Sequence, residues 1–294
     1  MKSKLLEGKI VAEKYQKEIA KEFNKLYKMT KQKPKMVAIK VNEDQASELY
    51  LRSQRRAADA TGVDHETIAL IGTTQRRLLS TIHDLNRDPK VHGIMLQMPL
   101  PEGFHLEEIL DSIDPKKDVE GVTSYNLGQL VLKKNRLVPC TALASIALID
   151  ETGEKLYGKE AVVVGSSKVV GRPVALLLLE RMVTTTICHI ATSEAGKLES
   201  HVKRADILVV GVGKANVIPG HWIKEGAIVI DVGINRVENK TVGDVEFEVA
   251  KERAKYITPV PGGVGPLTVT ILMKNLLTAF RWQCSDKTPI HSAH

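Results

Sequence analysis

The chain has 294 residues, of which 43% are hydrophobic and 4% aromatic, and its formal net charge is +7. This hydrophobic share supplies a globular core and excludes a disordered chain, and the length fits one large domain or, more readily, two of ordinary size. The basic residues are scattered and no aromatic–basic motif accompanies them, which argues against a nucleic-acid-binding protein. The charge then reflects either a solvated basic surface or an attraction for an anionic small molecule.

The cysteines and the absence of long apolar runs indicate in which cellular compartment the protein is expected. Cys140, Cys188 and Cys284 are far apart and odd in number, which suits a reducing compartment, and we interpret Cys140 and Cys188 as small core residues. No cluster of His, Asp and Glu has metal-ligand spacing, so no metal is predicted. The charged N-terminus lacks the apolar stretch of a signal peptide, and no run approaches the ~20 apolar residues of a membrane span. We therefore expect a cytoplasmic protein that does not bind a membrane.

The first half of the chain alternates helical and strand patterns. In chain order the patterns predict a helix over 5–28, a strand over Met36–Val41, a helix that contains Tyr50 and ends near Thr61, a strand over 68–70, a helix over 77–85 and a strand over Val91–Gln97. This alternation predicts an α/β layer with a parallel sheet. Gln97–Pro101 ends the third strand at the expected carboxyl edge, where open α/β sheets bind ligands, although proline alone also explains a strand end.

The second half repeats the α/β pattern. A loop over 114–121 precedes a helix that runs from Pro139-Cys140-Thr141 to about Glu151. The following patterns are a strand over Ala161–Val164, a helix ending at Leu179, strands over 184–189, 207–210 and 227–231, and a last helix over 267–282. This series is typical of a nucleotide-binding fold.

Two glycine-containing segments are candidates for ligand binding. Gly165–Gly171 follows a strand and opens a helix, which suits a phosphate cradle, but the spacing is not Gly-x-Gly-x-x-Gly and an ordinary tight turn is an alternative. Pro259–Pro266 holds three prolines and three glycines in eight residues, a rigid backbone that a planar ligand can approach closely. For Asp118 and Glu120, two acids of a loop, a solvated pair is the alternative to a functional role.

Together these segments resemble one family over about residues 3–283, the bifunctional methylenetetrahydrofolate dehydrogenase/methenyltetrahydrofolate cyclohydrolase family. The motifs that carry the resemblance are Ala46-Ser47 with Tyr50, Gln97-x-Pro-Leu-Pro101, Lys117-Asp-Val-x-Gly121, Pro139-Cys-Thr141, Gly165-x-Ser167-x-x-Val-Gly171, Asp231-Val-Gly-Ile-Asn235, Gly243-Asp-Val245 and Ile257-Thr-Pro-Val-Pro-Gly-Gly-Val-Gly-Pro-x-Thr268.

The resemblance implies a fold and a reaction. We expect an α/β protein with two α/β domains flanking a cleft: a folate-binding catalytic domain over 1–139 and 268–294, and a Rossmann-type NAD(P)-binding domain over 140–267. The family oxidises 5,10-methylenetetrahydrofolate with a nicotinamide cofactor and then hydrolyses the methenyl product to 10-formyltetrahydrofolate. Its members are commonly homodimers that pair through the second domain, so tetrahydrofolate derivatives and a second copy of the chain are the expected partners.

The resemblance also implies site residues. The expected catalytic positions are Tyr50, Gln54, Gln97 and Glu120. The expected substrate contacts are Tyr50 on the pterin, Glu120 at its amino edge, and Gln97, Pro99, Leu100, Pro261, Gly262 and Gly263. The expected cofactor contacts are Thr141, Gly165, Ser166, Ser167, Ile190 and Ile234.

The chain departs from the family pattern at several of these positions. Gln54 stands where the motif Tyr-x-x-x-Lys has its lysine, and Glu120 stands where the family has aspartate. A carboxamide neither takes nor gives a proton near neutral pH, and hydrolysis needs positioned acid–base groups that typically give ~10²–10⁴-fold. Hydride transfer depends chiefly on positioning. We therefore expect dehydrogenase activity to survive better than cyclohydrolase activity. A fully bifunctional enzyme and a non-catalytic ligand-binding paralogue are the alternatives.

The cofactor is taken as NADP, the family default, with NAD possible. Ser166 and Ile190 weaken the case for a site that holds a 2′-phosphate, yet no acid follows the second strand to hold a free 2′-hydroxyl. Lys168 and Arg172 are nearby cations.

Overall fold

A computed structural model describes residues 3–43, 45–238 and 240–285, with the backbone alone described at Gln45 and Ala46. Contacts between Cα atoms divide the chain into two compact units. One, called the six-stranded unit below, comprises Met1–Glu13 and Pro139–Ile271, and the other, the three-stranded unit, comprises Lys14–Val138 and Leu272–His294. Two of the three divisions fall within helices α1 (Gly8–Thr30) and α11 (Val264–Ser285), and the third falls between Val138 and Pro139.

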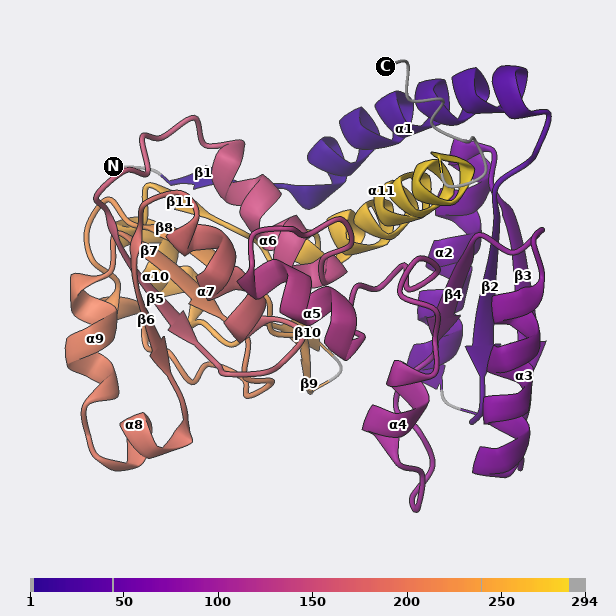
Figure 1. Cartoon of the computed structure of the whole chain (residues 1–294). Helices are drawn as coiled ribbons and strands as arrows, with labels where there is room; N and C mark the ends of the chain where they lie inside the picture. The colour runs from indigo at the N-terminus through magenta and orange to yellow at the C-terminus, as the bar shows by residue number, and fades with distance from the viewer. Residues whose placement is uncertain (1–2, 44, 239, 286–294) are drawn as a thin grey trace. The chain divides into compact units, whose positions relative to one another are not determined.

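The three-stranded unit contains a parallel sheet in the order β3-β2-β4 (Figure 1). Its strands are β2 (Lys35–Lys40), β3 (Asp64–Ala69) and β4 (Gly93–Leu96). The helices are α2 (Gln45–Thr61), α3 (Gln75–Arg87), α4 (Leu106–Asp111) and α5 (Ser124–Val131). Val37 and Ile39 pack with Leu78 and Ile82 of α3 on one face of the sheet. Since side chains alternate along a strand, Met36, Ala38 and Lys40 lie on the opposite face, which α2 covers.

The six-stranded unit contains a parallel sheet in the order β1-β11-β8-β7-β5-β6 (Figure 1). The strands are β1 (Lys4–Leu5), β5 (Glu160–Val164), β6 (Thr184–Cys188), β7 (Ile207–Val210), β8 (Ile228–Asp231) and β11 (Tyr256–Ile257). The helices are α6 (Cys140–Asp150), α7 (Gly171–Leu179), α8 (Ile190–Glu194), α9 (Leu198–Arg204), η1 (Gly220–Trp222) and α10 (Phe247–Arg253). An antiparallel pair, β9 (Asn235–Val237) and β10 (Lys240–Val242), lies outside this sheet. The central strands β5, β7 and β8 are apolar and buried, as a parallel sheet covered on both faces requires.

The expected α/β fold with two domains is confirmed, and the strands and helices follow the predicted alternation. The N-terminal segment differs from expectation, because residues 1–13 group with the six-stranded unit rather than with the folate-binding domain. The cause is the parallel pairing of β1 with β11, with Leu5 opposite Ile257. A two-residue strand has no periodicity that a sequence pattern can detect.

Two further expectations concern single residues and membrane spans. Cys140 and Cys188 are buried, as predicted, and neither forms a disulfide. Among the described residues, no helix combines the length and the apolar character that crossing a membrane requires.

Candidate active site

Gln97 lies at the carboxyl edge of the three-stranded sheet, directly after β4. Its backbone N–H donates to the Ile39 carbonyl at 2.8 Å, which continues the pairing of Ile39 with Leu96 and sets Gln97 beside Lys40. The Gln97 side chain is buried, and its Oε1 accepts no hydrogen bond from the described residues. A buried acceptor without a donor costs free energy, so this oxygen is suited to a group that approaches the sheet edge.

The segment after Gln97 is tied to the chain around the start of α2. The Met98–Pro99 peptide bond is cis. Ser47 Oγ donates to the Met98 carbonyl at 3.3 Å, and Asn42 Nδ2 donates to the Pro99 carbonyl. Leu100 is half-buried against the apolar cluster beneath α3. These contacts fix Pro99 and Leu100, two expected substrate-binding residues. The Ala46 side chain of the same motif lies outside the described part of the chain.

Gln54 faces into the protein from α2. Its side chain is 0% exposed, whereas Tyr50, one turn earlier, is partly exposed. Gln54 Oε1 lies 3.3 Å from His65 Nε2 on β3, and neither Gln54 Nε2 nor His65 Nδ1 has a described partner. Because His65 is opposite Met36 at the start of β2, Gln54 points toward the amino end of the sheet, away from Gln97. Burial, and then the charge of Arg55, lowers the pKa of His65, which favours the neutral imidazole.

A buried lysine at the carboxyl edge was not anticipated from the sequence. Lys40 is the last residue of β2 and only 8% exposed, and its ammonium pairs with the Glu48 carboxylate on α2. The hydrogen bond and charge of Lys40 hold the pKa of Glu48 below its usual value. The sequence pattern that could have indicated it is that Lys40 shares one face of an apolar strand with Met36 and Ala38.

The loop that carries Glu120 is organised by Asp118, which is buried, so the alternative of a solvated pair does not hold for Asp118. Asp118 is 1% exposed and accepts hydrogen bonds from Gly121 N at 2.8 Å, Thr123 N at 2.9 Å and Asn126 Nδ2 at 2.8 Å. Gly121 has a φ of 69°, and a Cβ there would lie 2.5 Å from the Val138 carbonyl carbon. The sequence spacing gave no indication of these tertiary contacts.

The pKa of Glu120 is raised to about 8. Desolvation of its carboxyl group is the main cause, although part of the side chain remains exposed, and the negative charge of Asp118 adds to it. A carboxyl group with this pKa is mostly protonated at pH 7 and can donate a hydrogen bond or release a proton to solvent. Glu120 follows Asp118 by two residues, so the hydrogen bonds of Asp118 that hold the loop also hold the backbone that carries Glu120.

The carboxyl edge of the six-stranded sheet is shaped by glycines. A Cβ on Gly165, after β5, would lie 2.4 Å from the Gly211 carbonyl oxygen after β7, and a Cβ on Gly171 would lie 1.9 Å from the Gly165 oxygen. Ser167 Oγ accepts from Val170 N at 3.1 Å and Gly171 N at 3.4 Å, which satisfies donors at the start of α7. This close-packed turn between neighbouring strands fits the phosphate region of a dinucleotide.

Two of the other expected cofactor contacts follow strands of the same sheet. Ile190, at the start of α8 after β6, is 74% exposed, and Ile234, after β8, is 69% exposed. Thr141 at the start of α6 and Ser166 are partly exposed. Exposed isoleucines after two parallel strands supply apolar surface where a flat ligand can lie.

Two carboxylates stabilise this edge, and the sequence did not reveal their roles. Asp231 accepts from the backbone N–H groups of Gly233 at 2.9 Å, Asp244 at 3.0 Å and Val245 at 2.9 Å. Burial raises its pKa to about 6 despite these bonds. Asp244 in turn accepts from Val212 N at 2.7 Å, Gly213 N at 3.0 Å and Lys214 N at 3.0 Å, and from Asn235 Nδ2 at 2.8 Å. The two carboxylates therefore hold the loops after β7 and β8, and the loop after β7 lies against Gly165.

The loop around Pro261 is held by the start of α1. The Val260–Pro261 peptide bond is cis, and Gly262 has a φ of 109°. Gly8 N donates to the Gly262 carbonyl at 2.9 Å, and a Cβ on Gly8 would lie 1.7 Å from the Gly263 oxygen. These contacts of Gly8 hold the loop against the start of α1, and Pro261 itself remains exposed.

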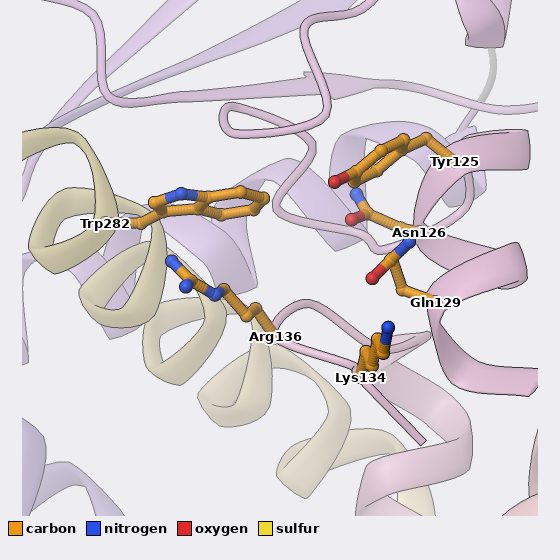
Figure 2. Close-up of a pocket in the computed structure, with 6 residues that line it drawn as sticks. All are labelled: Tyr125, Asn126, Gln129, Lys134, Arg136 and Trp282. Carbon is orange, nitrogen blue, oxygen red and sulfur yellow. The ribbon is translucent and has the colours of Figure 1, made fainter. Parts of the chain in front are cut away.

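A separate pocket of about 320 Å³ in the three-stranded unit contains none of the expected site residues (Figure 2). Its lining residues are Tyr125, Asn126, Gln129, Lys134, Arg136 and Trp282. The Arg136 guanidinium lies over the Trp282 ring, 4.6 Å from the ring centroid.

Two family models match the chain. The tetrahydrofolate dehydrogenase/cyclohydrolase catalytic domain matches residues 6–120, and the tetrahydrofolate dehydrogenase/cyclohydrolase NAD(P)-binding domain matches residues 139–284. The chain belongs to the tetrahydrofolate dehydrogenase/cyclohydrolase family. The glycine turn and its supporting carboxylates lie within the match to the NAD(P)-binding domain of the family, and Gln97 and Glu120 lie within the match to the catalytic domain.

Individual members of the family cover nearly the whole chain. The bifunctional protein FolD of Geotalea uraniireducens is 45% identical over 279 residues, which are 94% of this chain and 98% of that protein. The structure of the Trypanosoma brucei methylenetetrahydrofolate dehydrogenase-cyclohydrolase, complexed with NADP and an inhibitor, is 37% identical, with a TM-score of 0.93 and coverage of 98% and 100% of the two chains. The bifunctional FolD of Campylobacter jejuni is 38% identical, with a TM-score of 0.90 and coverage of 95% and 99%. The family identified from the motifs is therefore confirmed.

Proposed function

We propose that this protein oxidises 5,10-methylenetetrahydrofolate to 5,10-methenyltetrahydrofolate with NADP, and that its cyclohydrolase activity is weaker than its dehydrogenase activity. Support for the substrate and cofactor comes from the relatives, which are named as bifunctional enzymes and of which one is complexed with NADP. Support for the weaker cyclohydrolase activity comes from Gln54, which is buried and whose one partner among the described residues is His65, near the amino end of the three-stranded sheet.

The expected residues divide between holding the folate and holding the cofactor. In the proposal Tyr50, Gln97, Pro99, Leu100 and Glu120 bind the pterin end, and Pro261 to Gly263 contact the aminobenzoate. Bound NADP supplies the hydride acceptor. Thr141, Gly165, Ser166, Ser167, Ile190 and Ile234 position it.

Glu120 adds a protonation step to folate binding. Its pKa of about 8 means that most molecules carry a neutral carboxyl group at pH 7. In the proposal the amino edge of the pterin binds the carboxylate, so binding releases a proton, and the longer side chain relative to aspartate changes where that carboxylate lies. Misplacement by ~1 Å can cost on the order of 10²-fold in rate.

Both reactions should be assayed in the wild type and in Gln54→Lys. Lysine four residues after Tyr50 lies on the same face of α2 and is long enough to extend along it. We expect the cyclohydrolase kcat to rise at least ~10-fold and the dehydrogenase kcat to change less than ~3-fold. Ser53→Lys, which adds the same charge at an exposed position of α2, is the matched control.

Each alternative has its own outcome. Wild-type hydrolysis as fast as oxidation would favour the fully bifunctional enzyme. Binding of folate or NADP without turnover of either substrate would favour the non-catalytic paralogue. We also propose a cytoplasmic homodimer that pairs through the six-stranded unit, on the basis of the family resemblance. Light scattering on the wild-type protein would contradict the dimer if it found only monomer.

A further inference from the structure

The cyclohydrolase reaction needs an acid–base group, and the carboxyl edge of the three-stranded sheet offers a buried lysine. The hydrolysis adds water to the methenyl carbon and then protonates a leaving ring nitrogen. Gln54 cannot exchange protons, and it points away from this edge. Lys40 lies at the edge itself, as the last residue of β2.

The strand register places Lys40 on the same face as Gln97. Ile39 pairs with Leu96, and the Gln97 N–H donates to the Ile39 carbonyl, so Lys40 and Gln97 are neighbours on adjacent parallel strands. Ile39 and Leu96 face α3, so by alternation both polar side chains face α2. The neighbour of Lys40 on the other side is Ala69 of β3, whose small side chain leaves room for the lysine stem.

The partner of Lys40 connects the buried ammonium to solvent. Glu48 follows Ser47, which anchors the Met98 carbonyl, and precedes Tyr50 by two residues, so the ion pair lies among expected folate contacts. The Lys40 side chain is 10% exposed and the Glu48 side chain 51% exposed. A buried ammonium is costly without a partner, which Glu48 supplies, and the unpartnered Gln97 Oε1 is an acceptor on the same face.

We propose that the Lys40–Glu48 pair is the acid–base group for methenyltetrahydrofolate hydrolysis in this protein. This inference rests on the proposed folate-binding function. Glu48 takes the proton that water loses as its oxygen bonds to the methenyl carbon, and passes that proton to solvent. The Lys40 ammonium protonates N5 as the bond from this carbon to N5 breaks. The hydroxyl proton of the adduct restores Lys40 as the formyl C=O forms, and one proton is released overall.

The test supplies methenyltetrahydrofolate directly to the full chain and measures hydrolysis, with dehydrogenase activity measured separately. Lys40→Met removes the ammonium at similar volume, and we expect the hydrolysis kcat to fall at least ~100-fold while the dehydrogenase kcat changes less than ~3-fold. Lys40→Arg keeps the charge and the pairing with Glu48, but arginine does not release its proton. We expect it to fold normally and to lose hydrolysis, which a purely structural ion pair would not.

The control uses the second ion pair of the same strand. Lys35 pairs with Glu66 at 2.6 Å, at the opposite end of β2 from Lys40. Lys35→Met should leave both reactions unchanged. In a Gln54→Lys background, Lys40→Met should cost less than in the wild type, because two residues then supply the same function.

Several outcomes would overturn the inference. Hydrolysis that is undetectable in the wild type, unchanged in Lys40→Met or retained in Lys40→Arg would each do so. None of these results affects the proposed oxidation, which fails only if the wild type does not reduce NADP with 5,10-methylenetetrahydrofolate. Thermal melting of each variant separates a loss of hydrolysis from a loss of fold.

Discussion

The carboxyl edges of the two parallel sheets differ in how their polar groups are satisfied. At the six-stranded sheet, Asp231 and Asp244 accept hydrogen bonds from successive loops, and glycines bring backbone atoms into contact. At the three-stranded unit, Gln97 Oε1 lacks a partner among the described residues, and Glu120 has a pKa of about 8. At the six-stranded sheet the polar groups are satisfied by backbone hydrogen bonds, whereas in the three-stranded unit polar side chains are buried without such partners. Burial also raises the pKa of Asp231 to about 6, but its oxygens accept three backbone hydrogen bonds, so the unpartnered Gln97 Oε1 is what distinguishes the edge suited to chemistry.

The largest expected effect comes from a substitution that disrupts the glycine turn of the six-stranded sheet. Gly171→Ala places a Cβ 1.9 Å from the Gly165 oxygen, so the glycine turn must move. We expect NADP affinity to fall at least ~100-fold, with a loss of stability of roughly 2–4 kcal/mol. Isothermal titration with NADP and chemical denaturation measure the two effects.

The control for this variant is a glycine with open surroundings. Gly128 lies in α5, and a Cβ there meets nothing within 4 Å. Gly128→Ala should leave NADP binding unchanged and stabilise the helix by about 0.5–1 kcal/mol. Equal losses of NADP affinity in Gly171→Ala and Gly128→Ala would show that the close packing of the glycine turn is not the cause of the weaker binding.

An intermediate effect concerns the three-stranded unit and pH. The pKa of Glu120 is about 8 in the folded protein and near 4.5 in the unfolded chain, so the folded state binds more protons between these values. Its stabilising contribution is complete below pH 4.5 and is lost as the pH rises to 8. Glu120→Gln removes this dependence, so between pH 5 and pH 8 the free energy of unfolding should fall by roughly 2–4 kcal/mol more in the wild type.

Denaturant titrations at pH 5, 6.5 and 8 measure this difference. Glu102→Gln changes an exposed carboxylate of the same unit and serves as the control. Parallel pH dependences of the wild type and Glu120→Gln would contradict the environment described for Glu120.

The smallest expected effect concerns the stability contribution of Gln54. Gln54→Met removes a buried Nε2 that has no described partner while keeping the side-chain volume. We expect stability to change by less than about 1 kcal/mol, because the removal of an unsatisfied donor offsets the loss of the contact between Gln54 Oε1 and His65 Nε2. Thermal melting measures this, and a loss above about 2 kcal/mol would indicate that the contact with His65 stabilises the fold.

Sequence patterns predicted the features that backbone geometry encodes locally. The alternation of strands and helices, the turn from Gly165 to Gly171 and the rigid segment from Pro259 are all visible in short windows of sequence. The partners of polar side chains were not visible, because Gln54 and His65, or Asp118 and Asn126, meet only after the chain has folded. Lys40 was not identified as a site residue because a lysine at the end of a strand is usually exposed. Only the folded structure shows that α2 covers it.

Trp222 and Trp282 are the two tryptophans of the chain, and each belongs to a different unit. Trp222 packs against the core of the six-stranded unit, whereas Trp282 lies beneath the Arg136 guanidinium in the three-stranded unit. Their fluorescence therefore provides one optical reporter for each half of the molecule. Single-tryptophan variants, Trp222→Phe and Trp282→Phe, would show whether the halves unfold together or in sequence, and which one a bound ligand protects.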